Sequence, residues 1–300
     1  NGFTHFCVRA EQDGEVKDVR VLQGDYQGPR EGGETINVKR GNGGFGYGMG
    51  TYRGTMAGVP HFKNVKFNGR YPEAILEFQD EHFPGTVELK AFNPFIPLND
   101  KDSSIPAAFF EISFTNTGES KCIYTAYFAM NNLLPYATTR NTLKKQGEYT
   151  AIYMDSTLLK EEELQFGNFC IATDARNVCG QEYWYRAEWF DSMETYWRDL
   201  HVPGSLKQRH YEKDLRRLEK VREYDGEDMG TLAATVEVLP GQTGTVRFVL
   251  NWYFPNCANY WNPEKEKEKP TIWKNYYAKL FSDSMDCAVY CLNEWNRLYK

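Results

Sequence analysis

The chain has 300 residues, of which 41% are hydrophobic and 15% aromatic, and its formal net charge at pH 7 is −6. This composition suits a globular protein with a large core, and the length allows one large β domain or two ordinary ones. The negative charge argues against nucleic acid or anionic lipid as a partner, and no apolar run reaches the roughly 18 residues of a membrane-spanning helix.

The cysteines indicate the redox environment. There are seven, scattered along the chain, and an odd, scattered set is a poor disulfide framework. We therefore expect mostly free thiols and favour a reducing compartment such as the cytoplasm, although a periplasmic protein with free thiols would fit the same pattern. The chain opens with Asn1 and shows no signal-peptide pattern, which we interpret as a trimmed segment of a longer protein.

Short strands are predicted first, because apolar and polar residues alternate with a period of two between turn residues. Two hairpins follow from the Asp-Gly and Asn-Gly pairs, which favour tight turns. They comprise residues 3–9 and 16–22 around Asp13 and Gly14, and residues 62–67 and 71–78 around Asn68 and Gly69.

Residues 41–50 are dense in glycine and contain the spacing Gly-x-Gly-x-x-Gly. A dinucleotide-binding motif needs a strand before this spacing and a helix after it. The glycines that follow are too costly in a helix, so we predict a loop or bulge here and no cofactor.

Residues 86–92 and 107–114 alternate again and predict two strands. The stretch between them contains Pro94, Pro97 and Pro106, which argue against a helix and predict a stiff polar loop. Its short polar side chains favour fixing a turn or docking against another domain. These candidate residues are Asp100, Asp102, Ser103 and Ser104. A calcium loop is a weaker alternative, because glycine is needed where Ile105 stands.

Further strands are predicted at residues 122–130, 150–154, 169–173, 231–238 and 245–254. The first is apolar on both faces, as a central strand is. The last two should form a hairpin across residues 240–244, where Pro and Gly mark a turn. The acidic run at residues 161–163 is interpreted as a solvated surface.

Helices are predicted mainly near the C-terminus. Residues 191–200 begin with a capping box at Asp191, residues 210–223 are read as an exposed charged excursion, and residues 271–281 and 284–299 follow a solvated loop at 263–270. The last segment has an apolar stripe centred on Leu292 and Trp295. Such a stripe needs an apolar partner, so we expect it to dock on the strands or on a second copy of the chain.

The predicted fold class is mainly β: a large two-sheet antiparallel β-sandwich, with few helices, mostly C-terminal. More than ten short strands at close spacing carry this prediction. We divide the chain into a sandwich domain at residues 1–262 and a helical linker at residues 263–300.

Three stretches resemble the N-terminal domain of glycoside hydrolase family 116, which comprises β-glucosidases and non-lysosomal, bile-acid-type glucosylceramidases. They are NPFIPLNDKDSSIPAAFFE (93–111), FVLNWYFPNCANYW (248–261) and WKNYY (273–277). The resemblance implies a sandwich that precedes a helical-barrel catalytic domain, with a β-glucoside or glucosylceramide as substrate of the parent. It also implies that the catalytic residues lie in the barrel, so we expect this chain alone to be inactive.

Acidic, histidine and cysteine side chains are the remaining candidates for a catalytic or metal-binding site. Glycoside cleavage needs two facing carboxylates, and sequence spacing cannot pair those available, which are Asp80, Glu81, Asp100, Asp102, Glu182, Glu188 and Asp191. We expect surface or turn roles for them. The histidines and cysteines show no metal-binding spacing, so we predict no metal.

An aromatic and amide cluster follows the last predicted strand. Its members are Tyr253, Asn256, Asn259, Tyr260 and Trp261. Aromatic rings beside amides can bind a sugar, but core or interdomain packing is the favoured interpretation. Two functions therefore stay open: a supporting domain of a glucosidase, or a separate carbohydrate-binding module that recognises glucosides through exposed aromatics.

Overall fold

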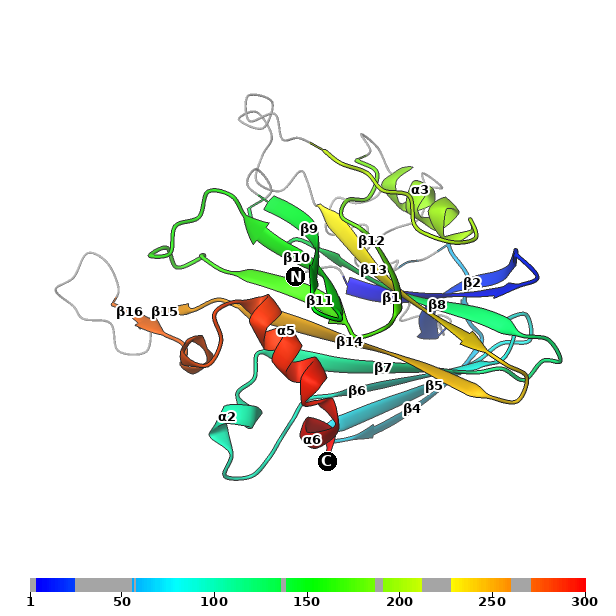
Figure 1. The fold of residues 1–300 in the computed structure, drawn as a ribbon, viewed down its shortest axis with the longest axis horizontal. Coiled ribbons are helices and arrows are strands. Elements are labelled where there is room, and N and C mark those ends of the chain that lie inside the picture. The colour runs from blue at the N-terminus through cyan, green and yellow to red at the C-terminus, as the bar shows by residue number, and fades with distance from the viewer. Residues whose placement is uncertain are drawn as a thin grey trace, which may run out of the picture.

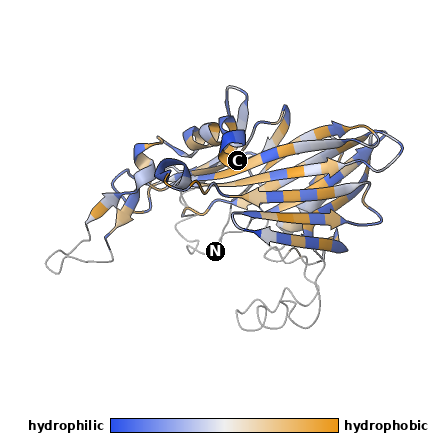
Figure 2. Cartoon of the chain, turned by 90° about the horizontal axis from the view of Figure 1, so that it is seen from below, coloured by the Kyte–Doolittle hydropathy of each residue, from blue (hydrophilic) through white to orange (hydrophobic). Residues whose placement is uncertain are grey.

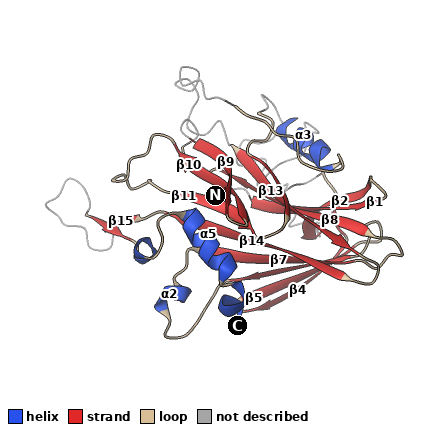
Figure 3. Cartoon of the chain, in the orientation of Figure 1, coloured by secondary structure: helices blue, strands red, loops and turns tan. Residues whose placement is uncertain are grey.

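A computed structural model of the protein describes residues 4–24, 56, 58–135, 139–186, 191–211, 228–259 and 271–300. Within these residues two large sheets pack face to face, and the helices lie outside them (Figures 1 and 3). The predicted class, a mainly β two-sheet sandwich with few helices, is confirmed.

The first sheet has six strands in the described part of the chain, antiparallel except for the pair β2–β3. Its order is β12 (Asn177–Gln181), β13 (Met229–Val238), β8 (Cys122–Asn131), β1 (Thr4–Gln12), β2 (Glu15–Gly24) and β3 (His61–Phe62). The central position predicted for residues 122–130 is confirmed, because β8 pairs with β13 on one side and β1 on the other.

The second sheet has eight described strands, all antiparallel. Its order is β4 (Asn64–Arg70), β5 (Glu73–Gln79), β6 (Thr86–Phe92), β7 (Ala107–Thr115), β14 (Thr243–Tyr253), β11 (Asn168–Thr173), β10 (Tyr149–Ser156) and β9 (Thr139–Gln146). A separate ribbon pairs β15 (Asn256–Ala258) with β16 (Ile272–Lys274).

The main core lies between the inner faces of the sheets. Hydrophilic and hydrophobic residues alternate along the strands (Figure 2), so each strand turns one face inward. Phe128 of the six-stranded sheet packs against Phe110 and Phe248 of the eight-stranded sheet, with ring centroids 5.4 and 5.9 Å apart. Aromatic contacts of this kind add to the stabilisation from buried apolar area.

Helices also cover the outer face of each sheet. Helices α5 (Ser284–Asn293) and α6 (Trp295–Tyr299) pack on the eight-stranded sheet, where α5 crosses β14 and β11 (Figure 1). Helix α3 (Asp191–Leu200) packs on the six-stranded sheet. The expectation that the C-terminal stripe docks back on the sandwich is confirmed, because Leu292 and Trp295 are buried there.

Two predicted turns are wrong. Strands β13 and β14 form no hairpin; they belong to opposite sheets, and the chain between them crosses the edge of the sandwich. Asn116 organises this crossing: its backbone bonds Gly241 and Gln242, and its Nδ2 donates to the Val238 carbonyl. The Pro-Gly turn therefore leads the chain from one sheet to the other and does not pair β13 with β14.

The second error is the turn at Asn68 and Gly69, which lie inside β4, paired with Ile75 and Ala74. The reversal falls at Tyr71 and Pro72. Gly69 instead makes room for a ring, because a Cβ there would lie 2.7 Å from Phe67.

Two helix predictions also need correction. Residues 271–281 form β16 and a 3-10 turn, η3 (Tyr276–Lys279), because the backbone of this segment pairs with β15. Conversely, the proline-rich loop contains a one-turn helix, α2 (Asp100–Ser103). The turn fits between Pro97 and Pro106, so neither ring obstructs it.

Several predictions fall outside the described residues. They are the glycine-dense stretch 41–50, most of the charged excursion 210–223, the loop 263–270, and the side chains of Glu188 and Asp191. No helix in the described ranges is long and apolar enough to cross a bilayer.

Candidate functional site

The candidate site is the loop between β6 and β7, beside the C-terminal helices (Figure 1). Asn99 caps α2 by accepting a hydrogen bond from the Asp102 backbone N–H at 3.1 Å. Ser103 closes the loop, because its Oγ bonds both the N–H and the carbonyl of Ile96 at 3.0 Å. The predicted turn-fixing role thus falls to Asn99 and Ser103.

Asp102 is the buried centre of the site. Arg297 of α6 donates to both carboxylate oxygens, at 2.6 and 3.2 Å, and the Tyr290 hydroxyl of α5 donates to Oδ1 at 2.7 Å. Asn99 Nδ2 donates to Oδ2 at 2.7 Å. A carboxylate held by four donors joins the loop to both C-terminal helices.

These contacts shift the titration of the site. The hydrogen bonds from Arg297, against the opposing effect of burial, lower the pKa of Asp102 to about 2. Burial and the hydrogen bond to Asp102 raise the pKa of Tyr290 to about 12. At neutral pH the Asp102 carboxylate is therefore charged and the Tyr290 phenol is neutral. In these states the carboxylate accepts and the phenol donates, as their hydrogen bonds require.

The other predicted loop residues do not join Asp102. Asp100, Ser103 and Ser104 are exposed at the surface of the turn. The calcium alternative does not fit, because both oxygens of Asp102 already accept from a guanidinium. The described residues also contain no cluster of three or more acidic, His or Cys side chains suited to a metal.

Asn256 holds a different junction. Its Nδ2 donates to the carbonyls of Glu161 and Glu163 at 2.8 and 2.7 Å, and its Oδ1 accepts from Lys274 Nζ at 2.6 Å. The side chain is buried and fully used in tying the β15–β16 ribbon to the 161–163 turn. Its predicted neighbours Tyr260 and Trp261 lie outside the described residues.

Sequence reasoning missed Tyr290 and Arg297, the partners of Asp102. A signal was present, because the two residues are seven apart and so share one face of a helix. It also missed exposed apolar side chains beside the loop. Tyr71 and Phe95 pack edge to face with centroids 5.6 Å apart, and Leu98 projects from the same loop.

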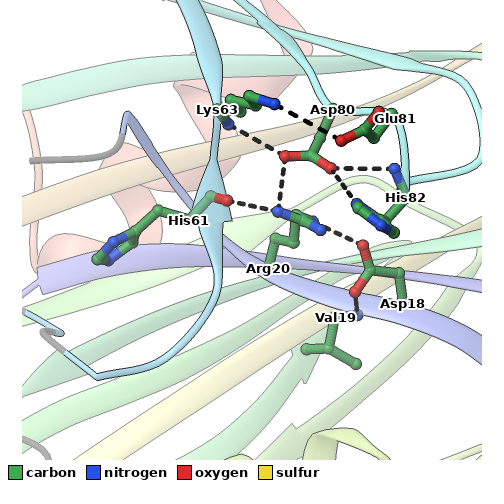
Figure 4. A network of polar contacts seen from close by, with 8 residues as sticks. All are labelled: Asp18, Val19, Arg20, His61, Lys63, Asp80, Glu81 and His82. Atoms are coloured by element: carbon green, nitrogen blue, oxygen red, sulfur yellow. Dashed lines mark hydrogen bonds and ion pairs between the residues drawn. The ribbon is translucent and has the colours of Figure 1, made fainter.

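The candidate carboxylates at Asp80 and Glu81 form a structural network (Figure 4). Asp80 accepts from Arg20 Nη1 at 2.8 Å and from the backbone N–H groups of Lys63 and His82. Burial would raise the pKa of Asp80, but these hydrogen bonds and the Arg20 charge lower it. Glu81 is exposed and lies 3.6 Å from Lys63. A glycosidase acid needs the opposite, a raised pKa, so Asp80 does not fit that role.

Other buried carboxylates are also paired. Among the described residues, Glu11, Asp102 and Asp228 are buried and lie against Arg9, Arg297 and Arg186. Such pairs are typical of structural sites rather than of two facing catalytic acids. Asp174 differs, because burial raises its pKa, but Arg247 lies 4.0 Å away and opposes the shift.

The comparison with protein-family models agrees with the sequence resemblance. The family model described as beta-glucosidase 2, glycosyl-hydrolase family 116 N-term, matches residues 3–298. The chain belongs to this family. No curated protein matches it. Among solved structures it is similar to a protein described as a kojibiose phosphorylase from the human microbiome, with a TM-score of 0.35 and 10% identity. That match covers 80% of this chain but spans only 24% of the other protein.

Proposed function

We propose that this family 116 chain is a non-catalytic domain that supports a catalytic helical barrel in a β-glucosidase or glucosylceramidase. The observation that carries this proposal is the Asp102 junction. It fixes the last two helices, and with them the direction in which the chain leaves the sandwich. In this proposal residues 263–300 lead towards the barrel, and α5 and α6 within them also form a layer of the sandwich.

The packing of α5 and α6 supports a rigid exit. Trp295 is buried against Phe92 and Phe109, with ring centroids 5.3 and 5.2 Å apart, and Arg247 lies over its ring at 5.0 Å. Below α5, the Asn168 side chain accepts from the Ser284 N–H at 2.9 Å. A following domain attached to such a helix would be held in a defined orientation and not on a free tether.

The paired carboxylates support the non-catalytic part of the proposal. Each of them already lies against an arginine, whereas glycoside cleavage needs one carboxyl that is free to deliver a proton. The substrate of the parent, a β-glucoside or glucosylceramide, would then be bound and cleaved in the barrel.

The test compares the isolated 300-residue chain with its parent, a chain that continues past Lys300. We expect the parent to release the aryl group from an aryl β-glucoside and the isolated chain to show only background. Turnover by the isolated chain that is lost in Asp174→Asn would contradict the proposal, since the activity would then reside here. Asp100→Asn, an exposed change on α2, is the matched control.

A carbohydrate-binding module is the second candidate. The observation that favours it is Trp273, which is 61% exposed on the β15–β16 ribbon, with the exposed Tyr276 just after it. A flat exposed ring can stack on a sugar. Titration calorimetry with β-glucosides tests this: millimolar binding by the isolated chain that disappears in Trp273→Ala would favour the module, and no heat of binding would remove it.

A further inference from the structure

The strongest unexplained feature is an exposed apolar corner formed by Tyr71, Phe95 and Leu98. The exposed fractions of these side chains are 79%, 56% and 107%. Single exposed apolar residues are ordinary, but adjacent ones on a loop indicate an interaction surface. The corner shares no residue with the Asp102 junction, which consists of Asn99, Asp102, Tyr290 and Arg297.

The corner is held rigidly. Leu98 adopts a left-handed backbone conformation with φ of 64°, which is uncommon for a leucine. The turn that imposes it is closed by the Asn99 N–H donating to the Ile96 carbonyl at 3.0 Å and by the bonds of Ser103 to Ile96. Strained backbone of this kind is found chiefly at binding and functional sites, and here it holds a leucine fully in solvent.

The corner also has a fixed position relative to the chain exit. The Asn93 N–H donates to the Pro72 carbonyl, which joins the loop to the β4–β5 turn that carries Tyr71. Tyr299, the penultimate residue, donates from its hydroxyl to Glu73 at 2.6 Å. The last residues of the chain therefore contact the same turn as the corner.

We propose that the corner of Tyr71, Phe95 and Leu98 is the surface against which the domain beyond Lys300 docks. This rests on the proposed function and adds the place of contact. The occupant is chosen by position: the chain leaves at this turn, so a domain attached to α6 would be delivered beside the corner at high effective concentration. The complementary chemistry is an apolar depression on that domain that accepts Leu98 and the paired rings of Tyr71 and Phe95.

The experiment measures how fast an introduced thiol reacts. Leu98→Cys is made in the isolated chain and in the parent, and its labelling by iodoacetamide is followed by mass spectrometry of the modified peptide. We expect labelling at least tenfold slower in the parent, because the docked domain covers the position. The control is Leu239→Cys, which is 48% exposed at the opposite end of the eight-stranded sheet and should react equally in both proteins.

Each outcome decides something. Equal reactivity of Leu98→Cys in the two proteins overturns the docking surface. If the parent nevertheless unfolds in one transition above the melting temperature of the isolated chain, the supporting function stands and only the surface is wrong. If the two parts unfold independently, both proposals fail. Protection of Leu98→Cys in the isolated chain by a millimolar alkyl β-glucoside would also overturn the docking surface, and would assign the corner to sugar binding.

Discussion

The two outer faces of the sandwich are covered in different ways. On the six-stranded sheet, the buried Arg9 adds hydrogen bonds to the apolar packing of α3 and the segment after it. On the eight-stranded sheet, α5 and α6 are held mainly by apolar side chains. The two covers thus differ in how far they depend on one buried charged side chain.

Arg9 is the centre of the first cover. It is buried, forms an ion pair with Glu11, and donates to the carbonyls of Leu200, Val202 and Gly204 at the end of α3. Its guanidinium also lies over the Tyr127 ring at 5.5 Å. Satisfying the last carbonyls of a helix with a cation is favourable, but the arrangement depends on every partner being present.

The second cover spreads its stabilisation over many contacts. The buried side chains on this side include Met285, Ala288, Leu292, Trp295 and Leu298. It also uses polar anchors at Ser284, Tyr290, Asn293 and Arg297, and the buried Asn251 amide donates to the sulfurs of Cys287 and Cys291. We therefore expect a single substitution at Arg9 to cause a large loss in the free energy of unfolding. Substitutions in α5 and α6 should instead lower it in proportion to the buried area that is lost.

The largest effect is expected for Arg9→Met. Removing the guanidinium leaves Glu11 as a buried unpaired charge and three carbonyls without their donor, so we expect a loss of about 3–5 kcal/mol in the free energy of unfolding. Urea denaturation followed by tryptophan fluorescence measures it. The double variant Arg9→Met, Glu11→Gln should recover at least about 1 kcal/mol. A single variant as stable as the wild type would show that the α3 cover needs no charge.

Trp295→Ala comes next. Loss of the buried ring leaves a cavity beside Phe92 and Phe109, and we expect the free energy of unfolding to fall by about 3 kcal/mol, without a change in strand content by circular dichroism. The matched control is Trp273→Ala, an exposed tryptophan, which should change stability by less than about 0.5 kcal/mol. If truncation after Ser282 leaves stability unchanged, the helices are a dangling linker and not a cover.

Asp102→Asn should produce a smaller, pH-dependent effect. The pKa of about 2 in the folded state lies below the unfolded value of about 3.9, so the junction stabilises the fold above about pH 4 and loses this contribution as the pH falls towards 2. Because Arg297 is partly exposed, we expect only about 1–2 kcal/mol at pH 6. Unfolding free energies of both proteins from pH 6 to pH 2.5 measure the difference, which should shrink steadily.

The control for this effect is Asp100→Asn on the same turn, which should follow the wild type at every pH within about 0.5 kcal/mol, because its side chain is exposed. A difference between Asp102→Asn and the wild type that stays constant down to pH 2.5 would mean that the lost contact is not the charge pair.

The smallest expected difference is in local opening. All seven cysteines are free thiols, and the sequence predicts mostly free thiols. Buried cysteines occur in the central core and in the apolar clusters under both helical covers. Cys7 lies under α3, Cys287 and Cys291 lie on the buried face of α5, and Cys122 lies in the central core. Burial raises the pKa of the Cys7 and Cys287 thiols, so they react only when their cover opens.

Because the α3 cover buries fewer apolar side chains among the residues that the structure describes, we expect Cys7 to be labelled about fivefold faster than Cys287, a difference of roughly 1 kcal/mol. Cys122 should react last, at the rate of global unfolding. Peptide-resolved labelling with a thiol reagent gives all three rates in one sample. Identical rates for Cys7 and Cys122 would indicate that the α3 cover opens only when the whole domain unfolds.

Local pattern was enough to predict much of this fold. The strands at residues 86–92 and 107–114 are predicted correctly because apolar and polar residues alternate along a strand with one buried face. The strand at residues 122–130 is predicted because an apolar run indicates a strand buried on both faces. The edge strands β9 and β12 were missed for the opposite reason. Strand β9 carries exposed lysines and little alternation, so its sequence resembles a loop, and only pairing with β10 makes it a strand.

The candidate site was predicted only in part. Asp102 was singled out, because short polar residues between prolines suggest a fixed turn, but its buried hydrogen bonds come from Tyr290 and Arg297, which lie 188 and 195 positions later. Asn256 was chosen for a possible sugar contact, whereas its amide is consumed by Glu161, Glu163 and Lys274. A polar side chain in a sequence does not reveal whether its hydrogen bonds are already taken.

The sequence by itself determined the class of the protein, the periodicity of its central strands, the apolar stripe of its last helix and its family. Each of these depends on residues that are close together in the sequence, where the spacing of apolar residues indicates which side chains are buried. The tertiary structure decided that β13 and β14 enter opposite sheets, that residues 272–274 form a strand, and that a buried arginine holds one cover while a tryptophan holds the other. These features depend on contacts between segments that are far apart in the sequence. Such contacts stabilise the fold only when both segments are in place.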